Sequence, residues 1–188
     1  VTGDIVMYNG KAYIALHDNP GYDPVISYWY WGEYNGGGGG GTASPNPAPG
    51  RYTLKAVHSG KCLDVDASGM ADGANIQQYS CNGTGAQAFD LTRDSEGYYH
   101  ATNANSKKSM DVAASGVADG TNIQQWTTHS GNNQRFSFVD KGNGQYEIRA
   151  LHSGKCVDVA GQYTTDRANV QQWSCNSQAN QRWVLTPS

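Results

Sequence analysis

One five-residue motif occurs three times in this chain at a constant interval. It reads Asn75-Ile76-Gln77-Gln78-Tyr79, then Asn122-Ile123-Gln124-Gln125-Trp126, then Asn169-Val170-Gln171-Gln172-Trp173, and each copy begins 47 residues after the last. An interval of roughly 20 to 50 residues is typical of a structural unit that is copied and stacked against its neighbours. Residues 51–188 are therefore expected to form one domain built from three copies of a 47-residue repeat.

Three further markers keep the same interval within the repeats. They are an opening tyrosine, an aspartate upstream of the motif, and a Gln-x-aromatic sequence downstream of it: Tyr52, Tyr99 and Tyr146; Asp64, Asp111 and Asp158; Gln87-Ala88-Phe89, Gln134-Arg135-Phe136 and Gln181-Arg182-Trp183. Turn sequences such as Ser59-Gly60 and Asp72-Gly73 separate short strand-like runs, and no helical periodicity persists. The sequence predicts an all-β fold with four short strands in each copy, and the aromatic residue of each Gln-x-aromatic sequence is expected in the core.

The composition excludes several classes of partner. Charged residues make up 15% of the chain, the formal net charge is −3 and the mean hydropathy is −0.65. A chain without a basic face is a poor ligand for nucleic acid or for an anionic membrane, and no apolar run is long enough to span a bilayer. We expect a monomer without cofactor or metal. Because no initiator Met or signal peptide is present, we expect Val1 to begin a processed or excised piece.

The four cysteines occupy equivalent places in two of the three copies. Cys62 and Cys81 lie in the first copy, Cys156 and Cys175 lie in the third, and each pair is 19 residues apart. The second copy has Ser109 and Thr128 there, and this paired loss favours disulfides within each copy. A zinc site is the disfavoured alternative, since no C-x-x-C spacing is present. Disulfides indicate an oxidising compartment, so the protein is expected to be secreted.

Two segments precede the repeats. Residues 1–34 are rich in aromatic side chains, and the runs 4–8 and 11–15 around Asn9-Gly10 predict a hairpin, with a further strand at 28–31. We expect a small β module that lacks its first strand. Residues 35–50 contain six consecutive glycines and then alternating prolines, which predicts a flexible linker.

The repeats resemble the ricin B-chain type lectin domain, equivalently carbohydrate-binding module family 13. The resemblance covers residues 51–188 and rests on the three Gln-x-aromatic sequences and on the agreement of the cysteine, aspartate and aromatic spacings. It implies a β-trefoil with pseudo-threefold symmetry. It also implies that each copy can hold a shallow sugar site, in which the aspartate accepts hydrogen bonds from hydroxyls and the aromatic ring stacks on the sugar.

Carried onto this chain, the resemblance gives two complete sites and one incomplete one. The second and third copies have every element, namely Asp111, Gln124, Trp126, Asn133 and Gln134, and Asp158, Gln171, Trp173, Asn180 and Gln181. The first copy has Asp64, Gln77, Tyr79 and Gln87, but Ala86 replaces the asparagine. We expect the first site to be the weakest, and we expect the loop of the second copy to be looser without its disulfide. The glutamines of the Gln-x-aromatic sequences are interpreted as scaffold more than as ligand contacts.

The N-terminal piece resembles chitin- and cellulose-binding modules of families 5 and 12. The resemblance rests on Gly3-Asp4-Ile5-Val6, Tyr8-Asn9-Gly10-Lys11 and Gly21-Tyr22-Asp23-Pro24 followed by Trp31. It implies a polymer-binding pair of exposed aromatics at Trp31 and Tyr22, with Trp29 or Tyr30 as the alternative.

Catalysis is not expected, because the chain offers one Asp–aromatic pair three times and no unique pair of acid and base. Asp64-x-Asp66-x-Ser68 imitates the start of a calcium loop, but its twelfth position is Asn75. His17, His100 and His129 are interpreted as isolated.

The predicted function is non-catalytic polysaccharide binding by a tandem of modules that belongs to a secreted glycoside hydrolase. A lectin or adhesin for cell-surface glycans is the first alternative, and a spacer without sugar binding is the second. The sugar is of the galactose, xylan, mannan or chitin type.

Overall fold

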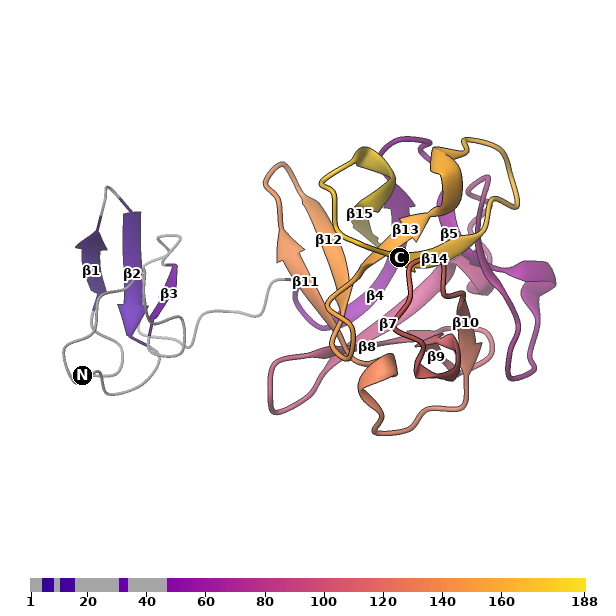
Figure 1. Ribbon diagram of the computed structural model, residues 1–188, viewed down its shortest axis with the longest axis horizontal. Helices are drawn as coiled ribbons and strands as arrows, with labels where there is room; N and C mark the ends of the chain where they lie inside the picture. Colours follow the sequence, from indigo (N-terminus) through magenta and orange to yellow (C-terminus); the bar gives the residue numbers. More distant parts are fainter. Residues whose placement is uncertain (1–4, 9–10, 16–30, 34–46) are drawn as a thin grey trace. The chain divides into compact units, whose positions relative to one another are not determined.

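The computed structural model describes residues 5–8, 11–15, 31–33 and 47–188 (Figure 1). The chain divides into two compact units, Val1–Pro45 and Asn46–Ser188. Most of the segment predicted as a linker, residues 35–46, lies outside the described residues. Within the described residues, no helix has the length and hydrophobicity needed to cross a bilayer.

The first unit contains a three-stranded antiparallel sheet in the order β1-β2-β3. Its strands are β1 (Ile5–Tyr8), β2 (Lys11–Ala15) and β3 (Trp31–Glu33). The register pairs Tyr8 with Lys11, as expected for strands joined by two residues. The third strand was predicted at 28–31 and overlaps β3 only at Trp31, and residues 28–30 lie outside the described part of the chain.

The second unit has four strands in each copy, which confirms the predicted all-β repeat. The first copy supplies β4 (Gly50–Ala56), β5 (Cys62–Val65), β6 (Ile76–Tyr79) and β7 (Ala88–Arg93). The second supplies β8 (Tyr99–Asn103), β9 (Ser109–Val112), β10 (Ile123–Trp126) and β11 (Phe136–Asp140). The third supplies β12 (Gln145–Ala150), β13 (Cys156–Val159), β14 (Val170–Trp173) and β15 (Arg182–Pro187).

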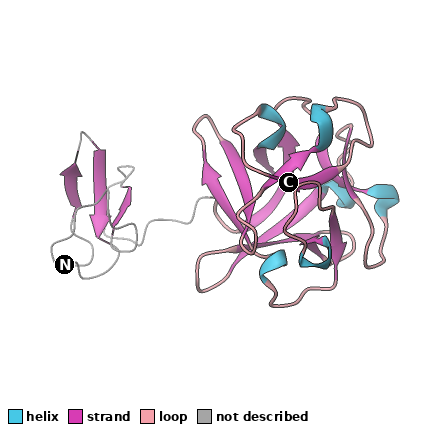
Figure 2. Ribbon diagram, in the orientation of Figure 1, coloured by secondary structure: helices cyan, strands magenta, loops and turns pink. Residues whose placement is uncertain are grey.

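The first and last strands of the copies close a barrel, and the middle strands form three hairpins. The antiparallel pairs β4–β7, β7–β8, β8–β11, β11–β12, β12–β15 and β15–β4 complete the circle. The hairpins are β5–β6, β9–β10 and β13–β14, and short helical turns lie around them (Figure 2). This is the β-trefoil that the resemblance implies.

The core follows from strand alternation in the barrel. In β8, Tyr99, Ala101 and Asn103 are buried, and the residues between them are partly exposed. Phe89, Phe136 and Trp183 are fully buried, which confirms their predicted place in the core. Each of these three aromatics belongs to the Gln-x-aromatic sequence of its copy.

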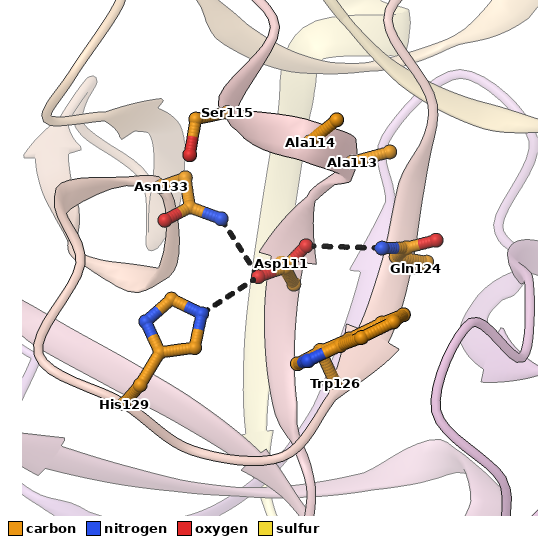
Figure 3. Close-up of a pocket in the computed structure, with 8 residues that line it drawn as sticks. All are labelled: Asp111, Ala113, Ala114, Ser115, Gln124, Trp126, His129 and Asn133. Carbon is orange, nitrogen blue, oxygen red and sulfur yellow. Dashed lines mark hydrogen bonds and ion pairs between the residues drawn. The ribbon is translucent and has the colours of Figure 1, made fainter.

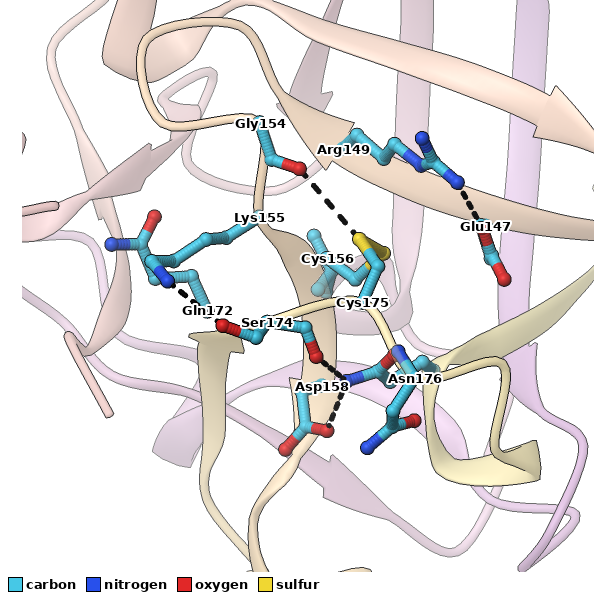
Figure 4. Close-up of a disulfide and its surroundings, with 12 residues drawn as sticks. Glu147, Arg149, Gly154, Lys155, Cys156, Asp158, Gln172, Ser174, Cys175 and Asn176 are labelled. Atoms are coloured by element: carbon cyan, nitrogen blue, oxygen red, sulfur yellow. Dashed lines mark hydrogen bonds and ion pairs between the residues drawn. A yellow bond between two sulfur atoms is a disulfide. The ribbon is translucent and has the colours of Figure 1, made fainter. Parts of the chain in front are cut away.

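The two predicted disulfides, Cys62–Cys81 and Cys156–Cys175, are present, and Figure 4 shows the second of them. Each joins the first strand of a hairpin to the loop that follows the second strand. In the second copy, the hydroxyls of Ser109 and Thr128 lie 2.8 Å apart and make a hydrogen bond at the equivalent place. The second copy therefore keeps a link between the strand and the loop at this place, although it is a hydrogen bond and not a disulfide.

Three side-chain amides join the hairpins where the copies meet. Asn75 Nδ2 donates to Asn169 Oδ1, Asn169 Nδ2 donates to Asn122 Oδ1, and Asn122 Nδ2 donates to Asn75 Oδ1, each over 2.9 Å. The three bonds form a closed ring with one member from each copy. The ring holds the hairpins, and therefore the residues that they carry, in one mutual orientation.

Candidate functional site

The hairpin register explains why the aspartates keep a fixed distance from the motif. Asp111 on β9 is the cross-strand partner of Gln124 on β10, and the other copies repeat the pairing as Asp64 with Gln77 and Asp158 with Gln171. Partners in an antiparallel pair point to the same face of the sheet. The hairpin therefore places a carboxylate and an amide side by side in every copy.

In the second copy, three amides hold the carboxylate of Asp111, and Figure 3 shows two of them, Gln124 and Asn133. Gln124 Nε2 donates to Oδ1 over 3.1 Å, and Asn133 Nδ2 and Gln134 Nε2 donate to Oδ2 over 2.7 and 2.9 Å. Asp111 is only 3% exposed. A buried carboxylate needs such donors, and here they also fix the direction of its remaining lone pairs.

The third copy repeats this arrangement around Asp158. Gln171, Asn180 and Gln181 donate to its carboxylate over 3.1, 2.7 and 2.9 Å. Burial raises the pKa of Asp158 above the usual value for an aspartate, and the three amide donors lower it in part. Asn180 Oδ1 is buried and has no hydrogen-bond partner among the described residues, so it can still accept one.

The first copy has a smaller set of donors and an additional acid. Gln77 and Gln87 donate to Asp64 over 3.1 and 3.0 Å, but Ala86 cannot supply the third bond. Gln77 Nε2 also donates to Asp66 Oδ1 over 3.0 Å. Asp66 has no counterpart in the other copies, where the equivalent residues are Ala113 and Ala160.

The glutamines of the Gln-x-aromatic sequences lie beneath the sites. Gln87, Gln134 and Gln181 are at most 1% exposed. In the second copy, Gln134 donates to Asp111 and to Thr127 O, and its Oε1 accepts from His129 N. Because these amides are used inside the protein, they position the aspartate and the neighbouring loop instead of meeting a ligand.

An aromatic side chain stands beside each aspartate on the second strand of the hairpin. Trp126 and Trp173 are 41% and 40% exposed, and Tyr79 is partly buried. A loop of the preceding copy passes next to each tryptophan, and a glycine of that loop lies beside the ring. A Cβ at Gly73 would lie 3.8 Å from the Trp126 ring, and one at Gly120 would lie 3.8 Å from the Trp173 ring. A side chain at either glycine would therefore begin in contact with the ring of the tryptophan.

A cavity of about 420 Å³ lies over Asp111 and Trp126 in the second copy. The other lining residues are Gln124, Asn133, His129 and the turn Ala113–Ser115 (Figure 3). The prediction that His129 is isolated is wrong, because its Nε2 lies 3.6 Å from Asp111 Oδ2. His129 holds the place of Asn82 and Asn176 in the other copies, and that alignment was the signal in the sequence.

A second cavity, of about 190 Å³, lies over Asp64 and Tyr79 in the first copy. It is lined by Asp66 as well, and by Arg167 from the third copy. The hairpins thus bring the predicted Asp, Gln and aromatic residues together in every copy. The N-terminal candidates are different, since Tyr22 lies outside the described residues and only the backbone of Trp31 is described.

Residues 50–183 match the model of the ricin-type β-trefoil lectin domain. The match begins at β4 and leaves the first unit uncovered. The comparison with curated proteins gave no match.

Among solved structures, a designed protein of threefold symmetry, ThreeFoil, is similar at 41% identity and a TM-score of 0.72, over 73% of this chain and 99% of that one. The exo-β-1,3-galactanase 1,3Gal43A from Clostridium thermocellum is similar at 36% identity and a TM-score of 0.73, over 76% of this chain but 31% of the galactanase. The Rhizoctonia solani agglutinin shares the fold at 24% identity and a TM-score of 0.68, over 74% of this chain and 96% of that one.

Proposed function

The chain belongs to the ricin-type β-trefoil lectin family, and from this membership we propose that residues 51–188 bind carbohydrate at the three hairpin sites. The domain of this family is a non-catalytic sugar-binding module. One observation carries the proposal. In the second and third copies, a half-exposed tryptophan stands beside a buried carboxylate that three amides hold in place.

This pairing suits the two surfaces of a sugar ring. A sugar has a rim of hydroxyls that donate hydrogen bonds and a face of C–H groups that packs on an aromatic plane. Asp111 and Asp158 would accept from the hydroxyls, and Trp126 and Trp173 would stack on the ring. Asn133 and Asn180 would hold the carboxylate and add polar contacts at the edge of the site.

We rank the sites by their donors and by their aromatic residue. The second and third sites have a tryptophan and three amide donors, whereas the first has Tyr79 and two donors to Asp64. Several weak sites on one body raise retention on a polymer that offers many copies of the ligand. A polysaccharide of the galactose, xylan, mannan or chitin type is therefore the ligand class that we propose.

We further propose that the chain is the targeting part of a secreted polysaccharide hydrolase. The similarity to 31% of an exo-β-1,3-galactanase supports this, since a domain of this kind is there part of a larger enzyme. The two disulfides support an extracellular location of the protein, because such bonds persist in oxidising compartments.

For the N-terminal unit, we propose a chitin- or cellulose-binding module over residues 1–34 that binds through Trp31 and Tyr22 and is joined to the trefoil by the segment 35–50. Its support is the sequence pattern around Tyr8 and Tyr22 and the three-stranded sheet β1-β2-β3.

The test is a binding panel with the full chain and the double variant Trp126→Ala/Trp173→Ala. Both proteins would be assayed against insoluble chitin, cellulose and xylan and against lactose, N-acetylgalactosamine and xylotriose. Val117→Ala, which removes an exposed apolar side chain that lines neither cavity, is the control.

We expect sugar binding that survives in the control and falls at least about tenfold in the double variant, because the stacking surface is lost. Binding to chitin alone that persists in the double variant would assign the function to the N-terminal unit. Red-cell agglutination without binding to any insoluble polymer would favour a lectin for cell-surface glycans. No binding to any of these ligands would favour a spacer domain without sugar binding.

A further inference from the structure

The first site differs from the other two at several positions besides Tyr79, and two of these replacements introduce charged side chains of opposite sign. Asp66 replaces Ala113 and Ala160, Arg167 replaces Gly73 and Gly120, and Ala86 replaces an asparagine. All of the charged replacements line the cavity over Asp64 and Tyr79. The first site is therefore a different site and not only a weaker copy.

Arg167 reaches this cavity from the third copy. Its backbone N–H donates to Gln78 O over 2.9 Å, which fixes the residue beside β6. The residue has a φ of 66°, in the region that favours glycine, and its side chain is exposed. In the other copies, a glycine lies beside the tryptophan ring at this place. Here a guanidinium is added to the wall beside Tyr79 instead.

The guanidinium of Arg167 has no internal partner in the part of the trefoil that the structure describes. Across residues 47–188, its guanidinium takes part in no hydrogen bond or ion pair, whereas Lys61 pairs with Asp166 and Arg135 pairs with Asp94. An arginine that lines a cavity, holds a positive φ and has no partner for its guanidinium among the described residues is available to a ligand.

The two acids of the cavity have internal partners. Gln77 Nε2 donates to both Asp64 and Asp66, and Gln87 donates to the other oxygen of Asp64. A sugar bound as in the other sites would turn its hydroxyls to Asp64. An anionic substituent on that sugar would be repelled from Asp64 and Asp66 and attracted to Arg167, so the charges fix one orientation.

We propose, on the basis of the carbohydrate binding proposed above, that the first site takes an acidic sugar and holds its carboxylate or sulfate on Arg167. A guanidinium presents parallel N–H donors that match the oxygens of either group. The chain then combines two sites for neutral sugars with one for an anionic sugar. It would recognise a polysaccharide in which acidic units accompany neutral ones.

The test isolates the first site in the full chain with the background variant Trp126→Ala/Trp173→Ala. Arg167→Gly is added to this background, which restores the residue of the other copies and keeps the backbone conformation. Lys107→Gly is the matched control. Lys107 is also a cation with a positive φ, of 62°, and the other copies have Gly60 and Gly154 at its place. Unlike Arg167, it lines neither cavity.

The ligands are two pairs that differ in charge, namely trigalacturonate with its methyl ester, and galactose 6-sulfate with galactose. We expect the background variant to prefer the anionic member of at least one pair by about tenfold or more, as a charge-assisted bidentate contact provides. Arg167→Gly should abolish the preference and Lys107→Gly should retain it. The pair that shows the preference identifies carboxylate or sulfate.

Equal binding within both pairs, or a preference that survives Arg167→Gly, would overturn the proposal. Tighter binding of a glucosamine trimer than of either anionic ligand would also overturn it, because Asp64 and Asp66 would then dominate. The full chain separates this failure from that of the proposed function. Neutral sugar binding by the full chain that is lost in the background variant keeps the proposed function, whatever the first site does.

Discussion

Asn133 Nδ2 lies 2.7 Å from Asp111 Oδ2 and donates a hydrogen bond to it. The same bond, also of 2.7 Å, joins Asn180 to Asp158 in the third copy. In the first copy Ala86 stands at this position and the fold is kept. The trefoil therefore forms without this asparagine in one copy, and we expect the asparagine to act mainly by directing the carboxylate.

Asn133→Ala should weaken the second site without unfolding the protein. With one donor lost, Asp111 is held less firmly, and we expect the affinity for the sugar to fall about tenfold, the value of one hydrogen bond to a charged group. Calorimetric titration in a Trp173→Ala background, which silences the third site, measures this loss. Asn132→Ala removes the exposed neighbouring amide and should change nothing, and an equal loss in both variants would contradict the assignment.

The disulfide of the third copy can be replaced by the pair that the second copy uses. Cys156→Ser/Cys175→Thr should fold, because Ser109 and Thr128 make a hydrogen bond of 2.8 Å at the equivalent place. We expect the free energy of unfolding to fall by about 3 kcal/mol, since the unfolded chain regains the freedom of the closed loop. Urea unfolding measures the difference, and an unchanged midpoint would show that the bridge does not stabilise the trefoil.

The amide ring of Asn75, Asn122 and Asn169 should stabilise the junction of the copies. Asn122→Ala leaves one donor and one acceptor of the partly buried ring without a partner. The expected loss in the free energy of unfolding is about 1–3 kcal/mol. Asn132→Ala, at the surface, should cost less than about 0.5 kcal/mol. If Asn122→Ala is as stable as Asn132→Ala, the amide ring does not stabilise the junction, and the barrel strands alone hold the copies together.

Sugar binding at the third site should depend on pH through Asp158. Burial raises the pKa of this carboxyl, so Asp158 becomes protonated at a higher pH than an ordinary aspartate does. The ionised form accepts the hydroxyls, and the affinity of the Trp126→Ala variant should therefore be full at neutral pH and decrease as the pH falls toward about 4. Near-ultraviolet circular dichroism would confirm that the protein stays folded. An affinity that is constant over this range would show that the carboxylate takes no part in binding.

The architecture was predictable because the three copies share every spacing. A constant interval fixes equivalent strands, and the alternation within each strand decides which residues enter the core. The Asp–Gln–aromatic arrangement was predictable for the same reason, since Asp111 and Gln124 are cross-strand partners in a short hairpin. A resemblance with three concordant copies therefore gave both the fold and the candidate sites.

The features that were missed depend on contacts that only the three-dimensional fold makes. Arg167 lies in the third copy but lines the cavity of the first, and no spacing within one copy reveals that contact. His129 was missed although it aligns with Asn82 and Asn176, because the alignment alone does not show that the loop brings its ring within 3.6 Å of Asp111. The hydrogen bond between Ser109 and Thr128 was missed as well, because the sequence shows only that two cysteines are absent.

The central claim is that a sugar stacks on Trp126 and Trp173 over their buried aspartates. The most direct measurement follows the indole N–H resonances of the full chain while lactose, N-acetylgalactosamine or xylotriose is added. Trp183 is an internal control, because its ring is buried and its Nε1 donates to Val157 O over 3.1 Å. We predict that the resonances of Trp126 and Trp173 shift with at least one sugar while that of Trp183 stays. If no sugar moves the resonance of Trp126 or Trp173, the account is contradicted.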